Sequence, residues 1–376
     1  MRNGLMKIGI LTLPLNINYG GILQAYALQT VLERMGHNVH LIEIKKKPFR
    51  MPLWKAPFAF GKRIMRNLSG QRWPIFYERK MNREVPIIEK NTNTFIRKYI
   101  KSKIVGNYSN IREDDFDIII VGSDQIFRAR FLHNIEHSFL DFAEGWKIKR
   151  LAYAASFGTD KWEYNEQQTK ECGRLLKLFD SVSVREISGV DLCRVHFDVN
   201  ADFVLDPTML LSAEDYIRLF KEANTPKSLG NLLYYILDET SEKTQIINNI
   251  AKEKGLLPFN VKSKSDVISA PLADRIQPPV EQWLRGFYDA EFIITDSFHA
   301  CVFSILFKKN FLVIGNECRG MSRFYSLLKT FSLENRLIVA DEKKNLKITD
   351  IDFDSVYEKL FMLRQKSNSF LHKNIG

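Results

Sequence analysis

Three side chains in this sequence, His299, Arg185 and Asp124, combine acid–base chemistry with anion binding and follow apolar runs typical of buried strands. His299 lies in the stretch from 293 to 307, IITDSFHACVFSILF, whose pattern predicts a strand, a polar turn and a helix. Ligands of α/β proteins bind where strands end and helices begin, and a helix N-terminus favours an anion. We therefore predict that His299 is an acid/base at an anion-binding cleft.

Arginines supply the expected partners of His299. Arg185 ends the predicted strand FDSVSV and precedes Glu186. An arginine at a strand end can clamp a carboxylate or phosphate with two hydrogen bonds, although an ion pair with a neighbouring acid is the alternative interpretation. Arg319 and Arg323, in the loop NECRGMSRF after a later strand, are candidates for a second anion contact, and a solvated loop remains the alternative for them.

Two further loops are predicted to face the same cleft. One follows the first strand and contains two glycines, which allow a ligand to approach the backbone closely, although a plain tight turn explains the same residues. The other follows the apolar run IIIV, and its Asp124 is a candidate to orient or deprotonate an acceptor hydroxyl. The candidate acceptor-binding residues are Asn16, Asn18, Tyr19, Gly20, Gly21, Ser123, Asp124 and Gln125.

The elements that must position these residues alternate between strands and helices. The chain begins with a strand KIGILTL, a helix ILQAYALQTVLERMG and a strand HNVHLIEI, which predicts a parallel sheet covered by helices. The alternation resumes after an Asp-Pro step at 206–207, interpreted as an interdomain hinge. We predict an α/β protein with two Rossmann-like lobes, 1–205 on the acceptor side and 206–350 on the donor side, and a helix at 351–376 that returns to the first lobe.

The charge of the chain is concentrated in one segment. The 376 residues carry a net charge of +11, and 45–83 alone holds twelve Lys or Arg and a single acid, so the remainder of the chain is neutral. Four cysteines without CxxC spacing indicate free thiols, and no apolar run is long enough to span a bilayer. Together these features predict a cytoplasmic protein.

The basic segment also contains large aromatic residues, a mixture that suits an anionic membrane surface or single-stranded nucleic acid. A solvated insertion whose aromatics pack on its own domain is the third interpretation. For the membrane interpretation, the predicted membrane-facing residues are Lys45, Lys46, Lys47, Trp54, Arg63 and Arg66.

Several blocks in the order found here resemble the polysaccharide pyruvyl transferase family. They are KIGILTLPLNINYGGILQAYAL, IIIVGSDQIF, SFGT, SVREISG, VLDPTMLL and TDSFHACVFSILFKKNF followed by RGMSRF. The resemblance implies a fold like the GT-B glycosyltransferases, phosphoenolpyruvate as donor and a sugar of a cell-surface glycan as acceptor. It also assigns Arg185 and His299 to the donor site.

One arginine that the resemblance would place in the donor site is absent from the corresponding position of this chain. Many family members have Arg-Leu-His where this chain has Ser297-Phe298-His299, so we expect Arg319 or Arg323 to replace that arginine in a donor site that also includes Ser297.

The chemistry expected of such an enzyme needs no redox cofactor and no metal. Phosphoenolpyruvate requires cations, and histidine suits the proton transfers of ketal formation. An acceptor on a polyprenyl diphosphate would place the protein at the inner face of the cell membrane, where the basic segment would hold it. A GT-B glycosyltransferase that uses a nucleotide sugar is the main alternative. A nucleic-acid-binding protein is a third possibility, without a role for His299.

Overall fold

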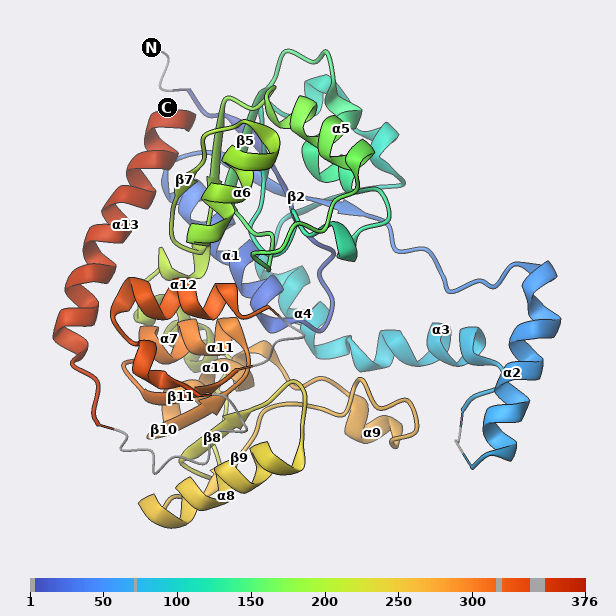
Figure 1. Ribbon diagram of the computed structural model, residues 1–376, viewed down its shortest axis with the longest axis vertical. Helices are drawn as coiled ribbons and strands as arrows, with labels where there is room; N and C mark the ends of the chain where they lie inside the picture. Colours follow the sequence, from blue (N-terminus) through green and yellow to red (C-terminus); the bar gives the residue numbers. More distant parts are fainter. Residues whose placement is uncertain (1–3, 71–72, 316–319, 339–348) are drawn as a thin grey trace.

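The computed structural model describes residues 4–70, 73–315, 320–338 and 349–376, and these form two parallel α/β lobes (Figure 1). The sheet of the first lobe has the strand order β3-β2-β1-β4-β5-β6-β7. Its strands are β1 (Lys7–Leu11), β2 (Asn38–Ile44), β3 (Ser102–Val105), β4 (Ile118–Val121), β5 (Lys149–Ala155), β6 (Ser181–Val184) and β7 (Asp202–Phe203). The sequence prediction of two parallel α/β sheets is confirmed.

The second lobe is built around the order β12-β11-β10-β8-β9, again with parallel neighbours. Its strands are β8 (Leu232–Tyr235), β9 (Pro258–Phe259), β10 (Phe292–Thr295), β11 (Asn310–Ile314) and β12 (Leu337–Ile338). In both sheets the first strands are added on one side of the starting strand and the later ones on its other side. The strand order therefore switches between β1 and β4 in the first sheet and between β8 and β10 in the second. Such switch points leave a crevice at the carboxyl ends of the strands.

Helices cover both faces of each sheet. In the first lobe they are α1 (Tyr19–Arg34), α4 (Lys90–Tyr99), α5 (Glu166–Leu176) and α6 (Ile187–Phe197). In the second they are α7 (Ala213–Glu222), α8 (Ser241–Lys254), α10 (Val280–Asp289), α11 (Phe298–Leu306) and α12 (Ser322–Phe331). The short helix α9 (Leu272–Arg275) contacts α3 (Tyr77–Ile88) instead. The central strands β1, β4 and β10 are almost continuously apolar because both of their faces are buried.

One hydrophobic core is continuous between the lobes. It joins Ile10 and Ile120 of the first sheet to Ile293 and Val313 of the second through helices α1, α10 and α11. Two smaller cores fill the opposite faces, beneath α5 and α6 in the first lobe and beneath α8 in the second. The shared core fixes the two lobes against each other and hence the width of the crevice between them.

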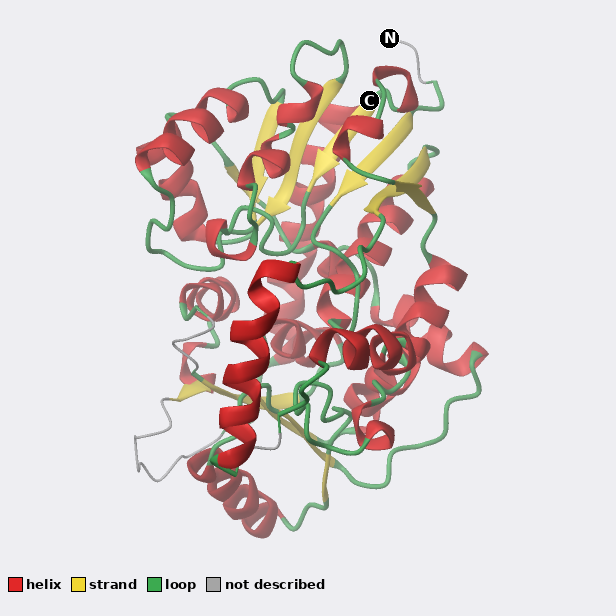
Figure 2. Ribbon diagram, turned by 90° about the vertical axis from the view of Figure 1, so that its right-hand side faces the viewer, coloured by secondary structure: helices red, strands yellow, loops and turns green. Residues whose placement is uncertain are grey.

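The last helix, α13 (Phe353–Ile375), runs along both lobes (Figure 1), on the side that is turned away from the viewer in Figure 2. Near its start Tyr357 donates a hydrogen bond to the carbonyl of Leu306 in the second lobe, 2.5 Å away. Further along, Ser367 Oγ accepts a hydrogen bond from the amide of Leu205 in the first lobe at 3.0 Å. The helix therefore braces the two lobes from the side.

The basic segment forms a helical hairpin that projects from the body of the protein, made of α2 (Ala56–Leu68) and α3 (Tyr77–Ile88) (Figure 1). No helix in the described part of the chain has the length and apolar character needed to cross a membrane. Cys172, Cys193 and Cys301 are buried free thiols, while Cys318 lies outside the described residues.

Candidate active site

A cavity of about 610 Å³ lies between the lobes, at the switch points of both sheets. From the first lobe its wall includes Asn18, after β1, and Asp124, after β4. From the second it includes Leu237, after β8, and His299, after β10. Four loops that are distant in the sequence therefore meet at one site because the carboxyl ends of both sheets face each other.

His299 is held between the two lobes. It lies in the first turn of α11, and its side chain is 8% exposed. Its Nε2 is 3.6 Å from Oδ2 of Asp206, while Nδ1 lies on the side of Gly20, in the first turn of α1. The imidazole thus has a carboxylate near one nitrogen and the first turn of α1 next to the other.

Gly20 is required for this position of the ring. A Cβ added to Gly20 would lie 2.0 Å from Nδ1 of His299, whereas the first contact of a Cβ at Gly21 is with Asn18, at 3.2 Å. We expect Gly20→Ala to lower kcat at least about thirtyfold by displacing the imidazole, because small misplacements of catalytic groups are costly. Gly21→Ala is the matched control, with an effect within a few fold. Steady-state kinetics of both variants checks this, and equal rates would contradict it.

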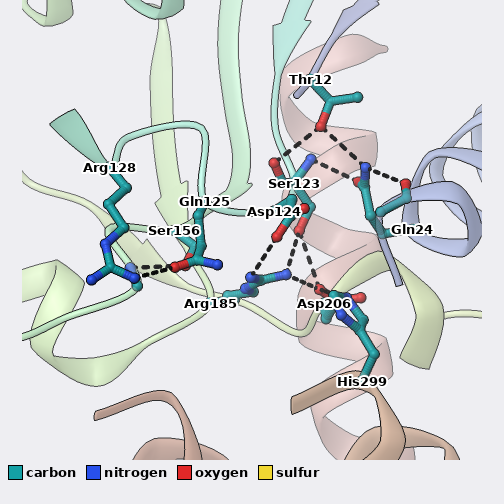
Figure 3. Close-up of polar contacts among 12 residues, drawn as sticks. Thr12, Gln24, Ser123, Asp124, Gln125, Arg128, Ser156, Arg185, Asp206 and His299 are labelled. Carbon is teal, nitrogen blue, oxygen red and sulfur yellow. Dashed lines mark hydrogen bonds and ion pairs between the residues drawn. The ribbon is translucent and has the colours of Figure 1, made fainter. Parts of the chain in front are cut away.

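Arg185 is at the centre of a buried charge cluster behind this wall (Figure 3). Its guanidinium contacts Oδ2 of Asp206 at 2.6 Å, Oδ1 of Asp124 at 3.3 Å and Oε1 of Glu186 at 3.4 Å. Its side chain is 1% exposed and is not part of the cavity wall. A charge buried this deeply needs such partners. The structure therefore favours the ion-pair interpretation of Arg185 over the donor clamp predicted from the sequence.

The cluster keeps Asp206 ionised. Burial by itself raises the pKa of a carboxyl, but the contact with His299 and the charge of Arg185 outweigh it and hold the pKa of Asp206 well below its usual value. Burial lowers the pKa of Arg185, but the charges of Asp206, Asp124 and Glu186 reverse that effect and raise it. Asp206 is thus a permanent negative charge next to the imidazole of His299.

Arg323 provides a cation on the cavity wall. It lies in the first turn of α12, and its guanidinium is 5.5 Å from the centre of the Phe298 ring. Arg185 approaches the same ring at 4.7 Å. Burial, together with the nearby charge of Arg185, lowers the pKa of Arg323 to about 10, so it remains charged at neutral pH. Ser297 also lines the cavity, and Arg319 lies outside the described residues.

The comparisons with known proteins agree with this geometry. The sequence matches the polysaccharide pyruvyl transferase family over residues 18–317, most of the chain. This chain belongs to the polysaccharide pyruvyl transferase family. No curated protein sequence shows a significant match to it.

Solved structures show that this family member has the GT-B fold. A Listeria monocytogenes protein assigned as a UDP-N-acetylglucosamine 2-epimerase aligns with a TM-score of 0.52 at 10% identity, covering 96% of this chain and 91% of that chain. The UDP-GlcNAc 2-epimerase of Neisseria meningitidis aligns with a TM-score of 0.47 at 9% identity, covering 97% and 92% of the two chains. At these identities the likeness concerns the fold alone.

The predicted acceptor-binding residues separate into two groups. Those on the cavity wall are Asn18, Asp124 and Gln125, with φ at Asp124 in the left-handed region at 55°. The others are not among the residues that line the cavity: Asn16, Tyr19, Gly20, Gly21 and Ser123. Among these, Tyr19 donates a hydrogen bond to the carbonyl of Pro278, 2.8 Å away, and so joins the lobes.

The six predicted membrane-facing residues all lie in the stretch that leads into the hairpin or within the hairpin itself. Lys45, Lys46 and Lys47 are exposed, and Lys46 forms an ion pair with Glu89 at 2.7 Å. Trp54 is exposed. Arg66 is 4.9 Å from the centre of the Trp73 ring. Arg63 is only 12% exposed and pairs with Glu78 at 2.6 Å, so its charge is neutralised by an ion pair inside the hairpin.

Sequence reasoning missed Asp206. The Asp-Pro step was interpreted as a hinge, but Asp206 is buried, accepts hydrogen bonds from the amide and hydroxyl of Thr208 at 3.0 and 2.6 Å, and contacts both Arg185 and His299. An acid directly after the apolar run FVL was a usable signal, because polar residues at strand ends face the crevice of an α/β sheet. Its partners, however, are distant in sequence.

Proposed function

We propose that this chain transfers pyruvate from phosphoenolpyruvate onto a sugar of a polysaccharide precursor, forming a ketal and releasing phosphate. The observation that carries the proposal is that one interlobe cavity contains His299, backed by Asp206, and the charged Arg323, in a chain of this family. A proton-transfer group and an anion-binding group next to each other are what this reaction requires.

The donor has two anionic groups, and the cavity has matching positive features. Arg323 and Arg128 both line it, and the N-termini of α1 and α11 open onto it through Asn18 and Ser297. Helix N-termini and arginines are the usual ligands of phosphate and carboxylate. In this proposal Arg323 binds the donor directly, and Arg185 holds the carboxylates of Asp124 and Asp206 in place.

The proposed reaction begins with proton transfer from His299 to the methylene carbon of the donor, which becomes a methyl group. One sugar hydroxyl then forms a bond to the positively polarised C2, and its proton returns to His299. Phosphate leaves with the electron pair of its C–O bond. A second hydroxyl of the same sugar closes the ketal ring, and its proton leaves with the phosphate. Arg323 stabilises the negative charge on the departing phosphate.

The acceptor is proposed to bind on the side of Asn18, Asp124 and Gln125. Asp124 lines the cavity while its Oδ1 is paired with Arg185, and in this proposal its carboxylate orients or deprotonates a sugar hydroxyl. A volume of about 610 Å³ lies in the range of cavities that bind drug-sized ligands, so donor and sugar can be bound together. We further propose that the sugar is carried on a polyprenyl diphosphate at the inner face of the cell membrane.

The test is to incubate the protein with phosphoenolpyruvate and a lipid-linked galactoside, and to follow phosphate release and product mass. A product with the mass gain of a pyruvate ketal supports the proposal. Because the fold is also that of nucleotide-sugar enzymes, a parallel reaction contains UDP-sugars in place of phosphoenolpyruvate. Transfer from a UDP-sugar alone would overturn the proposal.

The role of Arg323 gives a separate prediction. Arg323→Met removes the charge at similar length, so we expect the KM for phosphoenolpyruvate to rise at least about tenfold, since charge-assisted hydrogen bonds to the donor are lost. Arg323→Lys should recover part of this loss. Arg194→Met, at an exposed site on α6, is the matched control and should leave KM unchanged. An unchanged KM in Arg323→Met would remove Arg323 from the donor site.

A further inference from the structure

Helix α2 exposes an apolar stripe to solvent. None of its residues is buried, and Phe58 and Leu68 are 81% and 83% exposed. The short 3-10 turn Leu53–Lys55 that leads into α2 adds Leu53, which is 90% exposed, and Trp54. Trp54 and Met65 are also exposed, and the positions 54, 58, 65 and 68 recur at intervals of three, four and seven residues. This spacing places them on one face of the helix. Isolated exposed apolar residues are common, but a continuous stripe marks an interaction surface.

The opposite face of α2 already has its partners within the hairpin. Arg63 pairs with Glu78 through both of its terminal nitrogens, at 2.9 and 2.6 Å. Asn67 exchanges two hydrogen bonds with the backbone of Trp73, each of 2.7 Å. The hairpin is thus braced by polar contacts on one face of α2, and the hairpin as a whole projects from the body of the protein (Figure 1).

The charge of residues 45–83 indicates which kind of partner binds the apolar stripe of α2. Residues 45–83 hold twelve Lys or Arg against one acid, Glu78, so an anionic surface is attracted, whereas two such hairpins would repel each other. Lys55 and Lys62 are exposed within or next to α2. Nucleic acid requires aromatic rings for stacking, but half of the stripe consists of the non-aromatic Met65 and Leu68. Anionic lipid satisfies both the charge and the apolar face.

We propose that α2 lies in the interface of an anionic membrane, with Phe58, Met65 and Leu68 inserted at the acyl boundary and Lys55 and Lys62 at the lipid phosphates. Binding therefore depends on insertion as well as on charge, which differs from adsorption by the basic residues alone. The delivery of a lipid-linked acceptor to the cavity rests on the proposed function, but membrane binding itself does not.

The hairpin is fixed to the loop that forms one wall of the cavity. Glu84 of α3 pairs with the buried Arg275 of α9 at 2.5 Å, and Lys80 donates a hydrogen bond to the carbonyl of Ile268 at 3.1 Å. Ser265 and Gln277, which flank these contacts in sequence, line the cavity. A membrane held by α2 would therefore lie on the side of the cavity from which a lipid-linked sugar would enter.

Flotation with vesicles of phosphatidylglycerol and phosphatidylcholine tests the proposal. The triple variant Phe58→Gln/Met65→Gln/Leu68→Gln keeps the charge and good helix formers but removes the stripe. The matched control Leu229→Gln/Phe361→Gln/Met362→Gln removes three exposed apolar side chains elsewhere. We expect at least about a thirtyfold loss of vesicle affinity in the first and less than about twofold in the second, because each inserted side chain contributes by apolar burial.

Salt distinguishes insertion from adsorption. In 1 M NaCl the Debye length falls to about 3 Å, so binding by charge alone would vanish while inserted side chains should retain the wild-type protein on the vesicles. Wild-type flotation only at low salt, or equal flotation of the triple variant, would overturn the proposal. Tight RNA binding without vesicle binding, or dimerisation lost in the triple variant, would also overturn it in favour of another occupant.

The two proposals can fail independently. His299→Ala should still float with vesicles, and the triple variant should still release phosphate with a soluble acceptor sugar. If flotation behaves as expected but no variant uses phosphoenolpyruvate, the membrane proposal stands and the proposed function does not.

Discussion

His299→Gln should lower kcat by about 10²- to 10⁴-fold, the range of general acid–base catalysis. Glutamine has a similar length and can hydrogen-bond, but it cannot deliver a proton to the donor carbon. The side chain is on the cavity wall, and its Nε2 forms no hydrogen bond within the described residues, so the fold should persist. Phosphate release from phosphoenolpyruvate measures the rate, and circular dichroism confirms the fold. Near-normal turnover would remove His299 from the mechanism.

Two comparisons make this result specific. His133→Gln changes an exposed histidine and should have wild-type kinetics. Gly20→Ala acts only by displacing the imidazole, so it should add little further loss once His299 is glutamine. A double-mutant cycle detects such coupling between neighbours. Fully additive losses would show that Gly20→Ala acts through some other part of the cavity.

The alternation of strands and helices was readable from the sequence because both faces of each strand are buried. The runs KIGIL, IIIV and FIIT became β1, β4 and β10, and Gly255 ends α8 with φ at 64°, as its position after the helical pattern indicated. Local patterns of this kind depend on residues near one another in the chain. They give the elements and the crevice but do not show which side chains meet inside it.

The interior of the site was harder to predict because its contacts join distant parts of the chain. Arg185 has the right residue type for a donor clamp, but three carboxylates from separate loops neutralise it. Arg323 was one of two candidates, and only the fold places it on the cavity wall. Spacing along the sequence gives no measure of how many counter-ions a buried charge will have.

In the basic segment, by contrast, the sequence contains a local helical pattern that our prediction did not use. Its charge and aromatic content pointed to a surface for an anionic partner, but its helices were not predicted. The apolar positions 54, 58, 65 and 68 are spaced as one face of a helix, and Pro57 fits the first turn. Arg63 was assigned to the membrane because a sequence does not show an internal ion pair with Glu78.

Asp206→Asn should lower kcat by about 10²-fold while changing the KM for phosphoenolpyruvate by no more than a few fold. Asp206 does not line the cavity, so we treat it as a positioning residue that acts through His299. Its Oδ2 lies 3.6 Å from Nε2 of His299, so this carboxylate can hold the orientation in which the imidazole exchanges a proton with the donor. If Asp206 had only a structural role, the variant would lose stability but would not show a lowered kcat together with a nearly unchanged KM.

The same variant should be less stable, in a pH-dependent way. Asparagine keeps the shape but loses the charge that meets Arg185 at 2.6 Å, and hydrogen bonds to charged groups contribute about 1.5–3 kcal/mol. Because the pKa of Asp206 is depressed in the folded protein, its contribution is present above the unfolded value of about 4 and is lost as the pH falls below it. Denaturant unfolding should therefore show a difference of about 2 kcal/mol between wild type and variant at pH 7 that shrinks below pH 4. A difference that is as large at pH 3 as at pH 7 would mean that packing, and not the charge of Asp206, accounts for the loss.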